Sequence, residues 1–282
     1  MKKSVKIAML IASILCAAGV VLCAVGLFAF HFDFSQLNVY PIETNFHEVE
    51  EKFENISIEI RTADVVFALS ENGECRVVCE ETEKIKHSVT VVDDTLVIKV
   101  EDSRKWYDYI GFFFGRTLVT VYLPQTDYRA LSIKTDTGDV EMPSGFVFEE
   151  GCVETDTGDI MWRAQVAKDL NITVDTGDIC FDSAGAENIR VESNTGDVEF
   201  HDTVATESIF VETDTGDVNF DRSDAASIFV ETDTGDVEGT LLSEKVFFTE
   251  TDTGDIDVPR GTTGGRCEIR TDTGDIEIGI VR

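Results

Sequence analysis

The stretch TDTGDVEM, residues 135–142, contains a pentad, Thr-Asp-Thr-Gly-Asp, that recurs through the second half of the chain. Close copies begin at Thr155, Val174, Ser193, Thr213, Thr232, Thr251 and Thr271. The glycines of these eight copies are separated by 20, 19, 19, 20, 19, 19 and 20 residues. A period near 20 that holds over so many copies is typical of solenoid proteins, in which each repeat builds one unit of a stack.

Apolar and polar residues alternate on both sides of each pentad. Leu131 and Ile133 precede the first copy, and Val140 and Met142 follow it. Alternation with a period of two predicts half-buried strands, so each unit consists of a strand, a four-residue corner, a second strand and a variable connection. A unit this short cannot bury its apolar face alone, so we expect the copies to stack in register as an all-β, parallel β-solenoid. Eight rungs about 4.8 Å apart would give a rod ~38 Å long.

The rest of the chain is organised around this solenoid. We expect a cytoplasmic tail at 1–6, a transmembrane helix at 7–30, a juxtamembrane linker at 31–52, an irregular N-terminal β region at 53–130 with an aromatic insertion at 105–115, and the eight-rung solenoid at 131–282. Within the irregular region, ISIEIRTADVVF (56–67) repeats the strand–corner–strand frame without the glycine.

Residues 7–30 carry no charge, and 24 residues are enough for a helix to cross a hydrocarbon core of about 30 Å. Lys2, Lys3 and Lys6 precede this stretch, so the positive-inside rule places the N-terminus in the cytoplasm and the remainder outside. A retained anchor is favoured by the length of the stretch, and a cleaved signal peptide is the alternative. The formal net charge of −32 argues against nucleic acid as a partner.

Cysteine and histidine provide no obvious chemistry in the sequence. Outside the apolar stretch, five cysteines remain, without the spacing of a disulfide framework or a zinc site, and we expect them to act as small buried hydrophobes: Cys75, Cys79, Cys152, Cys180 and Cys267. The histidines are scattered and form no ligand pair: His31, His47, His87 and His201. Phosphate-binding loops and nucleophile elbows are absent from the sequence, so we expect neither an enzyme nor a small-molecule substrate.

Several motifs in the chain resemble those of a known family. The strand VTVYLP (119–124), then LSIKTDTGDVEM (131–142), and the recurring Thr/Ser-x-x-Gly-Asp-Val/Ile unit resemble the bacterial toast-rack proteins, an adhesin-like family built on a β-strand-repeat domain of unknown function. The resemblance covers roughly residues 42–282. It implies an extracytoplasmic, right-handed β-solenoid linked to surface adhesion or to envelope-stress systems, and it brings no catalytic residues. The uniform Asp-Thr-Gly-Asp and the long aromatic insertion depart from the family pattern.

The pentad has three interpretations: a protease signature, a structural corner and a cation site. Asp-Thr-Gly is also the signature of aspartic proteases, but that chemistry needs two carboxylates that share a proton, and eight copies with a second aspartate do not fit it. A structural corner fits best, because glycine supplies a positive φ and aspartate accepts backbone N–H bonds. Asn194 replaces the first aspartate in one copy, so charge is dispensable there. The corner residues are Asp136, Gly138, Asp139, Asp156, Gly158, Asp159, Gly177, Gly196, Gly216, Gly235, Gly254 and Gly274.

The corner interpretation is compatible with weak cation binding. Stacked rungs would align the second aspartates in a column, which we expect to bond the corner backbone and face solvent. Adjacent carboxylates could gather Ca²⁺ weakly without a dedicated metal site, and no other cofactor is expected. The candidates for such binding are Asp159, Asp178, Asp197, Asp217, Asp236 and Asp255.

Two regions are candidates for contact with a partner. The aromatic insertion would either plug the N-terminal end of the solenoid or dock to a membrane or protein through Trp106, Tyr107, Tyr109, Phe112, Phe113 and Phe114. At the other end, DIEIGIVR (275–282) follows the last pentad closely, so we expect that rung to expose strand edges for self-association or strand addition.

These observations favour a single-pass membrane protein whose exported β-solenoid is a non-catalytic binding or assembly scaffold at the cell surface. The alternative is a component or sensor of an envelope-stress response that acts through membrane partners.

Overall fold

The computed structural model describes residues 9, 12–22, 25, 41–105 and 117–281. The chain divides into two units, Met1–Pro41 with Arg104–Gly115, and Ile42–Ser103 with Arg116–Arg282. The described residues of the first unit before Pro41 are helical. None of the helices in the described part of the chain has the length and apolar character that a membrane crossing requires. Much of the predicted span 7–30, and all six aromatic residues of the insertion, lie outside the described residues.

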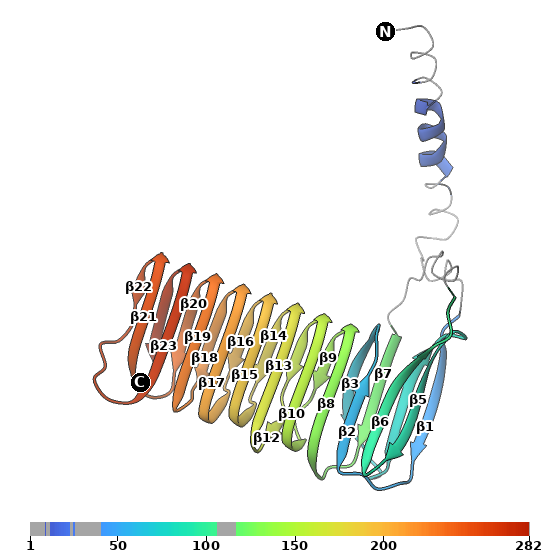
Figure 1. Ribbon diagram of the computed structural model, residues 1–282, viewed down its shortest axis with the longest axis horizontal. Helices are drawn as coiled ribbons and strands as arrows, with labels where there is room; N and C mark the ends of the chain where they lie inside the picture. Colours follow the sequence, from blue (N-terminus) through green and yellow to red (C-terminus); the bar gives the residue numbers. More distant parts are fainter. Residues whose placement is uncertain (1–8, 10–11, 23–24, 26–40, 106–116, 282) are drawn as a thin grey trace. The chain divides into compact units, whose positions relative to one another are not determined.

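The second unit is an elongated stack of strands in two twelve-stranded sheets (Figure 1). The first, called sheet A here, has the order β1 (Glu43–Val49), β4 (Cys75–Glu81), β7 (Thr117–Leu123), β3 (Ala63–Leu69), β9 (Val140–Met142), β11 (Ile160–Trp162), β14 (Ile179–Asp182), β16 (Val198–His201), β18 (Val218–Ser223), β20 (Val237–Leu241), β24 (Ile276–Ile280) and β22 (Ile256–Asp257).

Sheet B lies opposite and has the order β21 (Lys245–Thr253), β23 (Gly265–Thr273), β19 (Ser227–Thr234), β17 (Val204–Thr215), β15 (Gly185–Thr195), β12 (Gln165–Val166), β10 (Val147–Thr157), β8 (Asp127–Thr137), β2 (Asn55–Glu59), β6 (Thr95–Asp102) and β5 (Ile85–Val92). Strand β13 (Asp169–Thr176) also belongs to sheet B and pairs with β10 and β15. Each rung contributes one strand to each sheet, and the pentad forms the corner between them. The predicted parallel β-solenoid is confirmed, whereas the right-handed sense implied by the family resemblance stays a prediction.

The core lies between the sheets and consists of columns of like residues. In β15, for example, Ile189 and Val191 are buried while Arg190 between them is exposed. Phe181, Phe200 and Phe220 occupy one position in three successive rungs, and their rings stack at 4.8 and 5.0 Å between centroids. Stacking in register thus buries apolar faces that no single rung could cover.

The order of two rungs in the stack differs from their order in the chain. Strands β23 and β24 follow β21 and β22 in sequence, yet they lie between that rung and the rung of β19 and β20 (Figure 1). The expectation that the rung of residues 275–282 forms the exposed end is therefore wrong; β21 and β22 form it.

The interior residues provide a physical reason for this order. Thr249 of β21 occupies the position that Ile269 fills in β23, and Ile256 of β22 is 45% exposed where Ile276 of β24 is buried. A terminal rung has one side in solvent. Placing the less apolar of the two rungs there exposes less apolar surface and therefore costs less free energy.

The opposite end of the stack is closed by antiparallel strands. The rung of β2 and β3 lies between the rung of β6 and β7 and that of β8 and β9, again out of chain order. Beyond it, β4 pairs antiparallel with β7, β1 with β4, and β5 with β6. Antiparallel edges of this kind interrupt the parallel register and protect this end from further stacking.

Candidate interaction surface

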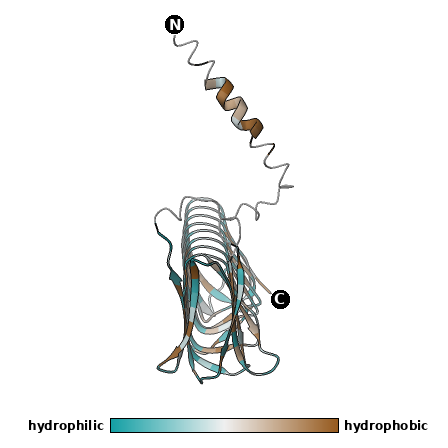
Figure 2. Cartoon of the chain, turned by 90° about the vertical axis from the view of Figure 1, so that its right-hand side faces the viewer, coloured by the Kyte–Doolittle hydropathy of each residue, from teal (hydrophilic) through white to brown (hydrophobic). Residues whose placement is uncertain are grey.

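Each corner is held in place by its glycine. Gly196 has a φ of 137°, and a Cβ built on it would lie 2.1 Å from the carbonyl oxygen of Gly177 in the neighbouring rung. The same approach of 2.0–2.1 Å recurs along the column from Gly138 to Gly254, although Gly235 lacks the positive φ. Close packing of backbone on backbone, more than the dihedral angle, therefore requires glycine here. Viewed along the stack, the corners lie one behind another (Figure 2).

The second aspartate of the pentad connects successive rungs. Its carboxylate accepts the backbone N–H of the corresponding aspartate one rung further along, at 2.7–3.0 Å between nitrogen and oxygen. The ladder runs through Asp64, Asp139, Asp159, Asp178, Asp197, Asp217, Asp236, Asp275 and Asp255. We expected these carboxylates to bond the corner backbone; the backbone that they bond belongs to the next rung. Asp64 starts the ladder in the rung that lacks the glycine.

The first aspartate of the pentad has a different environment. Its side chain is exposed in all seven copies that carry it, and no hydrogen bond from its own corner reaches it among the described residues. Asn194 donates to Asp175 at 3.3 Å in the adjacent rung. The Asx-turn role predicted for the first position is therefore absent from the described corners, and the second position supplies the side-chain bonds.

The threonine that opens the pentad faces inward. The hydroxyls of Thr232, Thr251 and Thr271 donate to glycine carbonyls of the adjacent rung, at 3.4, 3.0 and 3.1 Å. In four other rungs the hydroxyl at this position is buried and lacks a partner within the described structure: Thr135, Thr155, Ser193 and Thr213.

The outer face of sheet B carries a row of phenylalanines near the open end. Phe210 and Phe229 stack at 4.9 Å, and Phe248 continues the same register position on β21 beyond Glu268. We call Phe210, Phe229 and Phe248 the phenylalanine row. Arg190 lies 4.0 Å over the ring of Phe210 and Arg266 lies 4.8 Å over that of Phe248. Aromatic residues and arginine are the residues most enriched at protein interfaces.

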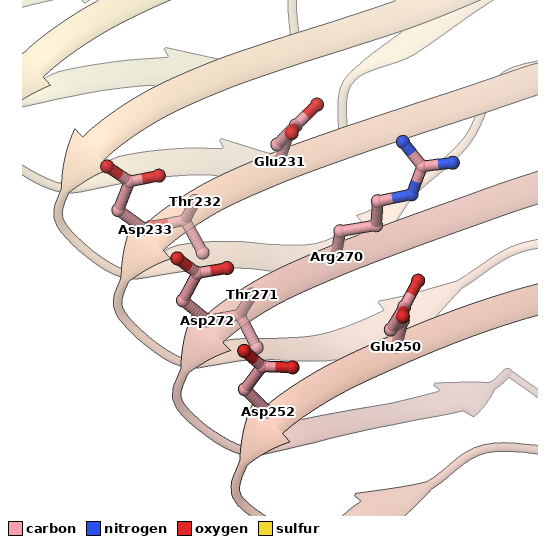
Figure 3. Close-up of a pocket in the computed structure, with 8 residues that line it drawn as sticks. All are labelled: Glu231, Thr232, Asp233, Glu250, Asp252, Arg270, Thr271 and Asp272. Atoms are coloured by element: carbon pink, nitrogen blue, oxygen red, sulfur yellow. The ribbon is translucent and has the colours of Figure 1, made fainter.

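A hollow of about 220 Å³ adjoins this row (Figure 3). Arg270 lies between Glu231 and Glu250 of the neighbouring strands, and its Nη2 atom is 2.5 Å from Glu268. At the strand ends, three first-position carboxylates line up beside it: Asp233, Asp272 and Asp252. The hollow is thus acidic, with one guanidinium, and suits a cationic group rather than an anion.

The terminal rung leaves hydrogen-bonding groups available. Strand β21 pairs only with β23 in the described structure, and Phe248 on it is 51% exposed. The amide of Asp255 donates to Asp275, but no N–H within the described residues reaches the carboxylate of Asp255 itself. A long, flat edge with exposed apolar residues is the type of edge to which another strand can add.

Two of the histidines lie in groups of possible metal ligands that the sequence did not predict. His47 of β1 lies near Cys79 and Glu81 of β4. One possible ligand atom from each residue lies within 4.8 Å of the other two. Pairing of β1 with β4, more than 30 residues along the chain, brings them together, which no local spacing could reveal. A second group, His201 with Cys180 and Glu199, lies on the surface.

Burial and hydrogen bonds shift the pKa values of Cys79 and Glu81 in the first group, and of the neighbouring His87. Burial lowers the pKa of the His87 imidazole, although Glu81, 3.1 Å from its Nδ1 atom, opposes the change. Burial by itself would raise the pKa of the Glu81 carboxyl, but hydrogen bonds from Asn45 and His87 bring it below its ordinary value. Burial raises the pKa of the Cys79 thiol to about 12, with a smaller contribution from Glu81.

In the surface group, the hydrogen bond from His201 to Glu199 at 3.1 Å and the carboxylate of Asp221, 3.6 Å from Nδ1, raise the pKa of the imidazole. Both ring nitrogens therefore already face carboxylates.

The remaining cysteines lie in strands. Cys75 and Cys267 are buried, Cys152 and Cys180 are half-buried, and none of the cysteines in the described part of the chain forms a disulfide.

A parallel β-stack with glycine corners defines a repeat protein of the solenoid class. The profile of the Toastrack DUF4097 family matches residues 53–208 and 186–282, and the chain belongs to this family. The resemblance stated from the sequence is thereby confirmed.

Solved structures that match the chain share little sequence with it. A "putative adhesin" from Parabacteroides distasonis is 12% identical, with 85% of this chain and 97% of that one covered and a TM-score of 0.45. A second "putative adhesin", from Bacteroides fragilis, is 15% identical, with 85% and 97% covered and a TM-score of 0.39. None of the curated proteins matches the sequence.

Proposed function

We propose that this protein is a non-catalytic binding or assembly scaffold, exposed outside the cell and held at the membrane by residues 7–30. One observation carries the proposal: the phenylalanine row lies on the outer face of sheet B and reaches the unpaired edge of β21, with Glu268 of β23 between Phe229 and Phe248. An aromatic row with stacked arginines, continuous with an open strand edge, offers both a desolvated contact and main-chain pairing to one partner.

The rest of the molecule is consistent with this role. The acidic surface keeps the rod soluble, and the stacked rungs hold the row rigidly, so little conformational entropy is lost on binding. The matching proteins from Bacteroides fragilis and Parabacteroides distasonis are described as putative adhesins, which agrees with the proposal but does not carry it.

Site-specific photo-crosslinking in cells that express the full chain tests the proposal. A photoreactive residue replaces Phe248 or Phe229 in the row, and Asn219 on the outer face of sheet A is the matched control. We expect a discrete adduct from positions 248 and 229 and none from 219. Equal adducts from all three positions, or none from any, would contradict the binding role.

The identity of the adduct separates the alternatives. An extracellular molecule indicates adhesion, and a second copy of the chain indicates assembly. A membrane protein of the same cell indicates the envelope-stress role.

The location is tested separately. Protease added to intact cells should remove the β-stack while leaving a fragment that contains residues 7–30 in the membrane. Full protection of the stack in intact cells, with digestion after lysis, would place the stack inside the cell.

A further inference from the structure

The N-terminal end of the solenoid has a polar core. Elsewhere most inward positions hold apolar side chains, but in the outermost layer several inward positions of β1, β4 and β5 hold Asn45, His47, Cys79, Glu81 and His87. The carboxylate of Glu81 and the imidazole of His87 are each only 2% exposed. Groups of this kind are costly to bury unless they bond one another or a ligand.

Within this layer one donor atom lacks a partner. The Nε2 atom of His47 is fully buried and has no hydrogen bond in the described structure. One ring nitrogen of His47, the sulfur of Cys79 and a carboxylate oxygen of Glu81 all lie within 4.8 Å of one another. A buried imidazole with an unpartnered nitrogen, beside a thiol and a carboxylate, is an arrangement that a metal ion would complete.

We propose that His47, Cys79 and Glu81 bind a divalent transition-metal ion of the Zn²⁺ type. Imidazole, thiolate and carboxylate are all zinc ligands, and a thiolate disfavours Ca²⁺ and Mg²⁺. Zinc bonds of ~2.0–2.3 Å in a tetrahedron place ligand atoms roughly 3.3–3.8 Å apart, so side-chain shifts of about 1 Å close the present group around an ion. Three protein ligands leave a fourth position for water.

The neighbouring residues orient the ligands. Glu81 accepts from the side chain of Asn45 and from the backbone N–H of His87, and the His87 ring lies 3.1 Å from the same carboxylate. Lys86, at 3.6 Å, is the nearest lysine or arginine to Glu81 and is itself 38% exposed along its side chain. A bound cation would compensate this buried carboxylate more fully. Binding converts the Cys79 thiol to a thiolate and releases its proton to solvent, so affinity rises with pH.

Metal binding to the full-length chain and its variants provides the test. Bound Zn²⁺ is measured after removal of excess metal, and Co²⁺ serves as a spectroscopic probe because thiolate ligation produces a charge-transfer band. We expect one ion per chain in the wild type. His47→Gln should weaken binding more than about 100-fold, since loss of even an outer-shell partner of a metal site costs 10–100-fold. Cys79→Ser should lose the charge-transfer band.

Two controls make the result specific. Cys75→Ser alters a buried cysteine on the same face of the same strand and should bind as the wild type does. His201→Gln disables the surface group and should also leave the stoichiometry unchanged.

Circular dichroism checks the fold of each variant. If Cys79→Ser does not fold, the outcome for His47→Gln, on the half-exposed edge strand, decides. Sub-stoichiometric binding in the wild type, equal affinity in His47→Gln, or loss of the ion in His201→Gln would overturn the proposal. The site does not depend on the proposed binding role, which concerns the opposite end of the stack.

Discussion

Glycine at the fourth position of the pentad makes two contributions, and they can be separated experimentally. Gly196→Ala introduces both an unfavourable φ and a contact of 2.1 Å with the carbonyl of Gly177. Gly73 also has a positive φ, 74°, but a Cβ there would meet no atom within 4 Å. We expect Gly196→Ala to lower the free energy of unfolding by roughly 3 kcal/mol or more, and Gly73→Ala by about 1 kcal/mol. Equal losses in denaturant titrations would show that the dihedral angle alone requires glycine.

The two aspartates of the pentad should respond differently to substitution. Asp197→Ala removes the acceptor for the amide of Asp217 and should cost about 1–2 kcal/mol. Asp197→Asn keeps an acceptor oxygen and removes a repelling charge, so we expect it within about 0.5 kcal/mol of the wild type. Asp214→Ala, at the first position, is the control and should also have little effect. Thermal melts of the three variants would contradict the ladder if Asp214→Ala proved the most damaging.

Strand order is the property of the elements that could not be predicted from the pentad. The motif fixes where each corner forms, and the alternation around it fixes which residues point inward. Because the copies are nearly identical, however, they do not specify which rung stacks on which. Only the interior residues distinguish β21 from β23, above all Thr249 against Ile269. This difference indicates which rung is terminal only when it is already known that one of the two forms the end of the stack.

The His47, Cys79 and Glu81 group escaped sequence-based prediction for a related reason. Metal-site motifs rely on short spacings within one element, but here the residues come from β1 and β4, and their proximity follows from an antiparallel pairing at the edge of sheet A. From the sequence, the alternation in β4 could predict that Cys79 and Glu81 lie on the same face of that strand. It could not predict that His47 lies beside them.

The interleaved order makes a prediction about truncation. Deleting the chain after Gly264 removes β23 and β24, which supply every strand partner of β21 and β22 in the described structure. We therefore expect amide exchange to show loss of protection in the remaining residues 245–257, so that the order of two rungs is lost although only one was removed. Deleting residues 245–264 instead, about one repeat period, leaves β23 and β24 paired on β19 and β20. In this control, rapid exchange in β23 would contradict the stacking order.

The aspartate columns should make the stability of the whole rod dependent on salt. Carboxylates about 4.8 Å apart repel by ~0.9 kcal/mol per neighbouring pair in bulk water. Raising NaCl from about 0.01 to 0.15 M shortens the Debye length from ~30 to ~8 Å. We expect a gain of about 2–3 kcal/mol, or roughly 5–10 °C in Tm for a domain of this size.

Calcium at matched ionic strength separates binding from screening. A further rise in Tm with millimolar Ca²⁺ would support weak binding along the columns, and the same Tm as in NaCl would contradict it.

The interleaved rungs also bear on how the molecule reaches its final form. As the chain emerges from its N-terminal side, the exposed edge of β19 and β20 first meets residues 245–257, which carry the same pentad as the correct partner. Docking there would yield a stack in chain order, a topological isomer with nearly the same hydrogen bonds but with Thr249 enclosed and Ile269 and Ile276 at the wet end. Folding of this protein is therefore a competition between two successive, almost indistinguishable rungs for one docking site, and a handful of interior side chains decides it.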